Sequence, residues 1–148
     1  MTIYDKMMIE VVDVESSRRL RVKRKALEEL DSLLKEIALH VSVVVVEGQR
    51  DVEALRSLGF EGHIEVCSHV GLSDVELCEI VAQDADSVLL LTDFDEEGLL
   101  MNNRLKNVLE RRGVNVEEGL RREVGRLMAV LGVYAVEDLD NMKFNSGL

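Results

Sequence analysis

The chain has 148 residues, of which 47% are hydrophobic and 32% charged, a composition typical of one globular domain. Only 3% are aromatic and no tryptophan occurs, so the core is expected to be aliphatic. The formal net charge of −11 excludes a surface that attracts polyanions from all sides, so any phosphate chemistry would need metal ions or a local basic patch.

Acidic residues interrupt residues 1–14, which therefore lack the cationic flank and apolar run of a signal peptide. No stretch approaches the roughly 18 apolar residues of a membrane span. Cys67 and Cys78 do not form a CxxC pair, and we expect buried thiols rather than a disulfide. These features predict a cytoplasmic protein with no membrane partner.

The first predicted element is an amphipathic helix over residues 15–40, with apolar residues three and four positions apart. Within residues 18–25 it carries six cations and no acid, namely Arg18, Arg19, Arg21, Lys23, Arg24 and Lys25. This basic segment fits either a nucleic-acid-binding surface or a solvated helix start that pairs with acids on the body. The lack of interleaved aromatic residues favours the second interpretation slightly.

Strand-like and helix-like segments then alternate. Residues 41–46 and 87–92 are apolar on both faces, as central parallel strands are. Shorter strands are predicted over 63–66 and 114–116. A short helix is predicted over 51–58. A second begins at Ser73 and precedes the strand over 87–92, and a third follows that strand and ends at about Arg112. Further helix is predicted over parts of 118–139. This alternation predicts an α/β fold with a parallel sheet and extra N- and C-terminal helices.

The last segment is expected to be helical over much of 117–148 and frayed over 143–148. Its basic residues Arg121, Arg122 and Arg126 are expected to face solvent. We find no linker composition or internal repeat, so residues 1–148 are expected to form a single domain.

Acidic turns follow both central strands: Glu47 ends the first, and Asp93 and Asp95 end the second. Functional groups of parallel α/β sheets gather beyond the carboxyl ends of the strands, so these acids should meet there if the strands are neighbours. Crowded carboxylates repel one another, and a divalent cation relieves that repulsion. Mg²⁺, with Mn²⁺ as an alternative, suits such oxygen ligands.

Neighbouring residues extend this predicted site. Asp51 and Glu97 are further metal-ligand or outer-sphere candidates, and Gly48 allows a close backbone approach to a ligand. Gly98 would loosen the start of a helix whose N-terminal amides attract phosphate. The alternative interpretation is that these acids simply cap helices.

The segment Val43–Asp51 with its EGxxD turn, and the segment Leu89–Gly98 with its TDFDxxG turn, together resemble the TOPRIM domain. That domain is shared by topoisomerases, bacterial-type primases, OLD-family nucleases, recombination-repair proteins and the nuclease that matures bacterial 5S rRNA. The chain is most similar to small stand-alone archaeal TOPRIM proteins. The resemblance implies a Rossmann-like core over 41–116, with a four-stranded parallel sheet flanked by helices.

The resemblance also implies roles for individual residues. Glu47 would be a general acid or base, and Asp93 and Asp95 would hold Mg²⁺, so all three are expected catalytic residues. The expected metal set is Glu47, Asp93, Asp95 and Asp51, and the expected substrate-binding residues are Arg50, Gly48 and Gly98.

Three functional classes follow. We prefer a Mg²⁺-dependent nuclease or other phosphotransferase acting on RNA or DNA, because all three core acids of the family pattern are present. A topoisomerase is not expected, since the chain has no room for a DNA gate and its two tyrosines, Tyr4 and Tyr134, lie in unpromising segments. The alternatives are a non-catalytic nucleic-acid or nucleotide-binding module, and a subunit that docks as a homodimer or on a partner protein.

One further group offers zinc-compatible atoms: His63, Cys67, His69 and Cys78. Their spacing matches no zinc-finger pattern, so zinc is the less favoured interpretation. The loop over 68–73 could instead bring Ser68 and His69 to the substrate, although an ordinary exposed loop is favoured.

Overall fold

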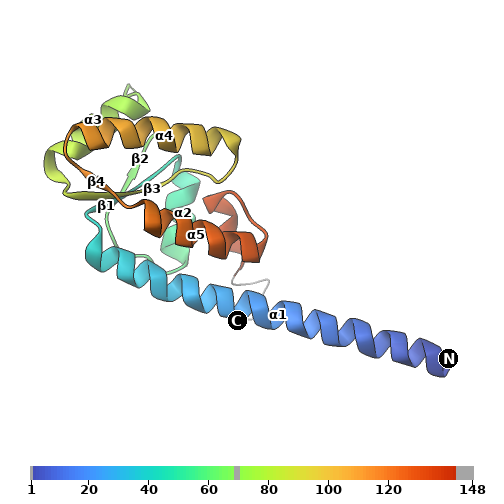
Figure 1. The fold of residues 1–148 in the computed structure, drawn as a ribbon. Coiled ribbons are helices and arrows are strands. Elements are labelled where there is room, and N and C mark those ends of the chain that lie inside the picture. The colour runs from blue at the N-terminus through green and yellow to red at the C-terminus, as the bar shows by residue number, and fades with distance from the viewer. Residues whose placement is uncertain (1, 69–70, 143–148) are drawn as a thin grey trace.

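The computed structural model describes residues 2–68 and 71–142 and confirms the predicted four-stranded, all-parallel sheet flanked by helices (Figure 1). The strand order is β2-β1-β3-β4. The elements, in chain order, are α1 (Ile3–His40), β1 (Val43–Val46), α2 (Gln49–Ser57), β2 (Ile64–Val66), α3 (Asp74–Asp84), β3 (Ser87–Leu91), α4 (Glu96–Arg111), β4 (Asn115–Val116), α5 (Glu118–Leu131) and the 3₁₀ helix η1 (Val136–Asn141).

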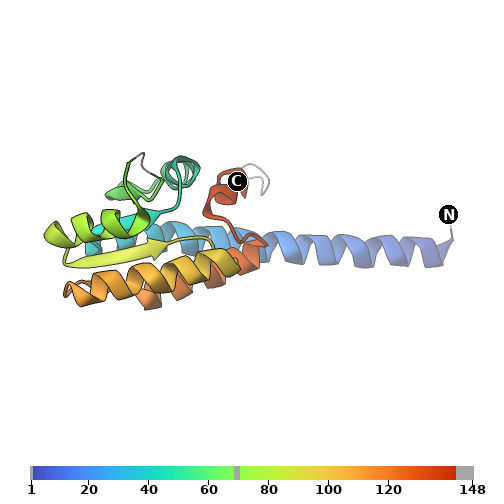
Figure 2. The same ribbon diagram turned by 90° about the horizontal axis from the view of Figure 1, so that it is seen from above.

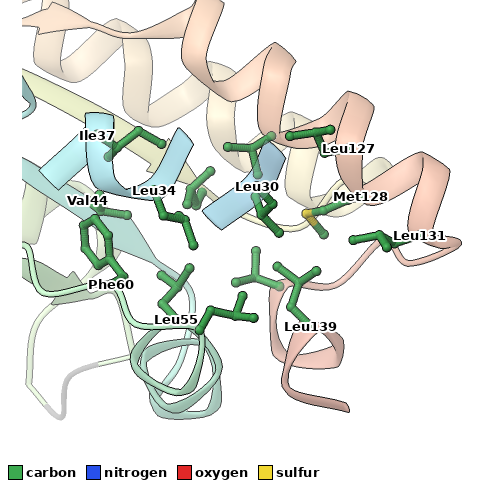
Figure 3. Packing of buried hydrophobic residues seen from close by; sticks show 14 of the residues in the cluster. Leu30, Leu34, Ile37, Val44, Leu55, Phe60, Leu127, Met128, Leu131 and Leu139 are labelled. Atoms are coloured by element: carbon green, nitrogen blue, oxygen red, sulfur yellow. The ribbon is translucent and has the colours of Figure 1, made fainter. Parts of the chain in front are cut away.

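The central strands β1 and β3 are buried on both faces because helices cover the sheet on each side. Successive strand residues point to opposite faces. Val44 and Leu89 therefore face α1, α2, α5 and η1, whereas Val45 and Leu90 face α3 and α4. Figure 3 shows the first of these clusters, in which Leu30 of α1 packs near Met128 of α5. Both clusters are mainly aliphatic, as the composition predicts.

Helix α1 begins at Ile3, so the predicted start at residue 15 is wrong. Thr2 caps the helix reciprocally with Asp5: the Thr2 Oγ1 accepts from the Asp5 N–H at 3.1 Å, and the Asp5 Oδ2 accepts from the Thr2 N–H at 3.0 Å. This capping box is readable in the sequence. The expected apolar stripe over residues 15–40 includes the part of the helix that packs on the body, which begins at Ala26.

The N-terminal half of α1 projects away from the body (Figure 2). Every side chain that the structure describes between Thr2 and Lys25 is exposed, and burial begins at Ala26. Within the described residues, only Arg19 of the basic segment forms an ion pair, and its partner is Glu15 on the same helix, at 3.3 Å. The basic segment therefore does not pair with acids on the body, contrary to the favoured interpretation.

Candidate active site

The site lies where β1 and β3 run side by side, with Val46 paired to Leu91 at their carboxyl ends. From this point β1 continues through α2 to β2 on one side, and β3 continues through α4 to β4 on the other. The two helices also cover opposite faces of the sheet. Such a reversal in strand order opens the crevice in which α/β sheets bind ligands.

Glu47 and Asp93 meet at this reversal. The Glu47 Oε2 accepts a hydrogen bond from the backbone N–H of Asp93 at 2.9 Å. The carbonyl of Glu47 also accepts from the Ser68 N–H at 3.2 Å, so the strand end and the following loop are tied together. Of the three acids expected to meet beyond the strand ends, Glu47 and Asp93 are therefore in contact.

The carboxyl group of Asp93 lies in an environment that disfavours its charge. Burial, followed by the adjacent Glu47 carboxyl, raises the pKa of Asp93 to about 7. Its Oδ1 accepts from the Val136 N–H of η1 at 3.2 Å, which partly opposes the shift. Near neutral pH this acid is thus divided between its charged and uncharged forms, and a nearby cation would favour the charged form.

Two other predicted site acids do cap helices, as the alternative interpretation proposed. The Asp95 Oδ1 accepts from the Gly98 N–H at 2.7 Å at the start of α4. Asp51 is buried, and its Oδ2 accepts from the Gly48 N–H at 2.9 Å at the start of α2. Burial is also the main cause that raises the pKa of Asp51. Asp93 accepts from the first N–H of η1, but Glu47 caps no helix, so capping does not explain why Glu47 contacts Asp93.

Across the described residues 2–68 and 71–142, no three His, Cys, Asp or Glu side chains are gathered closely enough to hold a metal ion. Glu47 and Asp93 are brought into contact, whereas the carboxylate of Asp95 is turned to the α4 N-terminus. The site is therefore a pair of carboxylates with a third nearby, rather than a closed ligand cage.

Arg121 was expected to face solvent, and that expectation is wrong. It is buried, and its Nη1 donates to the carbonyls of Leu90 at 3.0 Å and Thr92 at 2.8 Å. Its Nη2 donates to the carbonyl of Asp93 at 3.2 Å, and the guanidinium stacks 4.2 Å from the centre of the Phe94 ring. Arg121 therefore positions the turn that carries Asp93.

The short length of β4 explains why an arginine occupies this place. The Glu117 N–H donates to the Val88 carbonyl at 2.9 Å, but β4 does not extend far enough to supply donors to the next outward carbonyls of β3. Arg121 supplies them instead. Buried carbonyls without donors are costly, so the guanidinium completes the edge of the sheet.

Gly98 has a packing role that the sequence did not suggest. A Cβ at this position would lie 1.9 Å from the carbonyl oxygen of Asp93, so only glycine allows α4 to start this close to the acidic turn. The Gly98 N–H already donates to the Asp95 carboxylate, so this amide forms part of the helix cap.

The remaining predicted residues lie around the site or apart from it. Arg50 is exposed at the start of α2, Glu97 is exposed on α4, and Ser68 is exposed next to Gly48. Cys67 and Cys78 are buried free thiols, as expected, and burial raises their pKa values to about 12 and about 11. His63 pairs with Glu65 at 2.8 Å, and His69 and residues 143–148 lie outside the described residues.

A family model described as "Toprim domain" matches residues 42–127, which span the sheet, both acidic turns and most of α5. The chain belongs to the Toprim domain family. The match covers Glu47, Asp93 and Arg121, so the acids and the arginine that positions one of them lie inside the Toprim region.

Relatives of this Toprim protein occur in archaea. It is 32% identical over 123 residues to a UPF0292 protein of Methanosarcina barkeri, covering 81% of this chain and 84% of that protein. It is 35% identical over 115 residues to a UPF0292 protein of Thermococcus onnurineus, with 78% and 81% covered. A solved structure of an Aquifex aeolicus protein shares the fold, with a TM-score of 0.56 and 23% identity over 78% of this chain and 95% of that one.

Toprim membership associates the chain with nucleic acid and with metal-dependent function in general, since Toprim domains generally bind Mg²⁺ through acidic residues. Among the residues described here, no helix combines the length and the apolar character needed to cross a membrane.

Proposed function

We propose that this Toprim protein is a Mg²⁺-dependent phosphoryl-transfer enzyme that cleaves phosphodiester bonds in nucleic acid, with Glu47 and Asp93 at its centre. The observation that carries the proposal is the contact between these two acids at the strand reversal. It is supported by the raised pKa of Asp93, because a buried acid beside a second carboxyl is stabilised in its charged form by a cation.

The donor set fits Mg²⁺. One oxygen of each acid is already oriented by a backbone N–H: Glu47 by Asp93, Asp93 by Val136, and Asp95 by Gly98. Mg²⁺ is usually bound by one or two carboxylates together with waters and substrate phosphates, so a two-carboxylate site needs no third protein ligand. Glu47 and Asp93 would hold the ion, and Asp95 lies close enough in the chain to assist.

When bound, the ion would polarise the phosphate and neutralise the charge that develops on it. Glu47 would exchange a proton with the attacking or leaving oxygen, a role suited to a half-buried carboxylate that is not tied to a helix cap. Arg121 would keep the Asp93 turn in place through its three carbonyl contacts. Its buried charge would also partly offset the negative charge of the two acids.

A non-catalytic binding module is the second candidate. The observation that favours it is that Asp95 is engaged as a helix cap, so the third acid of the family pattern is not directed to a shared metal position. Such a module would bind nucleic acid without cleaving it.

The test is Mg²⁺-dependent cleavage of structured RNA, single-stranded DNA and duplex DNA by the wild type and by Glu47→Gln. The proposal predicts that this substitution lowers the cleavage rate by about 100-fold or more, the usual contribution of a positioned acid or base. Glu53→Gln, an exposed change on α2, is the matched control and should cleave as the wild type does. Binding without cleavage by the wild type would favour the second candidate, and cleavage that survives both Glu47→Gln and Asp93→Asn would refute the assignment.

A further inference from the structure

A cavity of about 490 Å³ lies between α4 and α5, beside the edge of β3 that Arg121 completes. Its apolar walls include Phe94, Leu99 and Tyr134, and its polar lining includes Asn102 and Arg122. Cavities of roughly 300–1,000 Å³ with mostly apolar walls and a few polar groups are typical of small-molecule sites.

Asn102 is the unusual residue of this lining. It is only 5% exposed, and its Oδ1 is the one buried side-chain oxygen or nitrogen of the described residues that has no hydrogen-bond partner. A buried amide oxygen without a donor is unfavourable, and native structures rarely keep one without a reason. This oxygen is enclosed by protein atoms, so a ligand reaches it only if the Asn102 side chain turns toward the cavity that it lines.

The cavity shares a wall with the acidic site. Phe94, which lines the cavity, stands between Asp93 and Asp95 in the sequence, and its backbone N–H donates to the Tyr134 carbonyl at 2.8 Å. Arg121 also lines the cavity, stacks on the Phe94 ring and bonds to the Asp93 carbonyl. A ligand in the cavity would therefore sit next to the turn that carries Asp93.

The charges of the lining suit a ligand attached to a phosphate. Glu118 is the acidic residue there, and Lys106 pairs with it at 3.2 Å. Arg122 is exposed and forms no ion pair in the part of the chain that the structure describes. The free charge at the rim is thus positive, although the protein as a whole is acidic.

We propose that this cavity binds the base of a nucleotide whose phosphate lies toward the acidic site. The identification of the ligand as a nucleotide rests on the proposed function. The preference for a planar ring with a polar edge rests on the residues that line the cavity. Phe94, Leu99 and Tyr134 offer apolar and aromatic surface to a planar ring. Turned toward the cavity, the Asn102 amide would offer a donor and an acceptor to the edge of that ring, as asparagine does for adenine.

The test measures the dissociation constants of the four ribonucleoside monophosphates and of a short mixed-sequence single-stranded oligonucleotide by isothermal titration calorimetry with Mg²⁺ present. Asn102→Leu removes the amide at nearly constant volume, and Ala129→Leu fills part of the cavity. Each is expected to weaken binding by about tenfold, the scale of one well-placed hydrogen bond or of lost space. Asn102→Leu breaks no side-chain hydrogen bond through Oδ1, so its melting temperature should stay at or above that of the wild type.

A matched pair of exposed residues provides the control. Leu99 lines the cavity and is 48% exposed, whereas Leu100 does not line it and is 63% exposed. Leu99→Ala should weaken binding severalfold, and Leu100→Ala should leave it unchanged.

If the monophosphates bind, the site accepts the base of a free nucleotide as well as a base within a strand. If only the oligonucleotide binds, the site accepts a base only within a strand. The inference is overturned if neither ligand binds the wild type, or if Asn102→Leu and Ala129→Leu bind both as the wild type does. The cleavage rate of Glu47→Gln separates the two proposals, because it should fall by about 100-fold or more, whereas Asn102→Leu and Ala129→Leu report on the cavity through the dissociation constants. If Glu47→Gln cleaves normally while Asn102→Leu loses binding, the proposed active site fails and the nucleobase site stands.

Discussion

Replacing Arg121 by methionine should destabilise the protein strongly, because Arg121 supplies hydrogen-bond donors that no strand provides. The change keeps the aliphatic stem and removes the three contacts to the Leu90, Thr92 and Asp93 carbonyls, at 3.0, 2.8 and 3.2 Å. Each buried carbonyl left without a donor costs about 1–3 kcal/mol. Burial lowers the pKa of Arg121, because removing its charge from water is unfavourable. The uncharged methionine avoids this desolvation free energy, which offsets part of the loss. The net loss should therefore be about 3 kcal/mol in the free energy of unfolding.

Urea unfolding monitored by far-ultraviolet circular dichroism measures this loss. Arg122→Met is the matched control, since Arg122 is the exposed neighbour, and it should change the stability by less than about 0.5 kcal/mol. Equal stabilities of the two variants would refute the role given to Arg121. Because the lost contacts hold the Asp93 turn, Arg121→Met should also weaken Mg²⁺ binding under conditions where it remains folded.

Three further predictions follow from the site and from α1. The pKa of Asp93 is raised from 3.8 to about 7, so the contribution of its protonated form to stability is full below pH 4 and is lost as the pH rises through 7. The melting temperature of the wild type without metal should therefore fall over this range. Asp93→Asn should show no such fall and should be the more stable protein at pH 8. Gly98→Ala should cost about 2 kcal/mol or more in urea unfolding, because its Cβ would collide with the Asp93 carbonyl, whereas Gly119→Ala, whose Cβ meets nothing within 4 Å, should be neutral or slightly stabilising. Neutralising three cations of the basic segment to glutamine should weaken nucleic-acid binding and flatten its dependence on salt concentration; an unchanged salt slope would exclude this segment as a phosphate-contacting surface.

The parallel sheet and the meeting of Glu47 with Asp93 could be predicted because both depend on local patterns. Continuous apolar runs identify buried central strands, and acids that follow such strands must emerge at the same edge when the strands are neighbours. The register of Val46 with Leu91 then brings the two turns together. The sequence carries this information within a few residues of each acid.

The burial of Arg121 could not be predicted in the same way, because it depends on how long a different strand is. A two-residue β4 leaves the outer carbonyls of β3 without partners, and nothing in the residues around Arg121 reports that shortage. The cap role of Asp95 was similarly ambiguous, since an aspartate before a helix is suited to both a cap and a metal. The nucleobase cavity was missed because its walls come from α4, α5 and the turn between β3 and α4.

The central claim, that Glu47 and Asp93 form a divalent-cation site, is tested most directly by titrating Mg²⁺ into the wild type, Glu47→Gln and Glu53→Gln while recording the melting temperature. A ligand at ten times its dissociation constant stabilises the native state by about 1.4 kcal/mol, which raises the melting temperature by a few degrees. The account predicts this rise for the wild type and Glu53→Gln and its loss in Glu47→Gln. An equal rise in all three proteins, or no rise in the wild type with either Mg²⁺ or Mn²⁺, would contradict it.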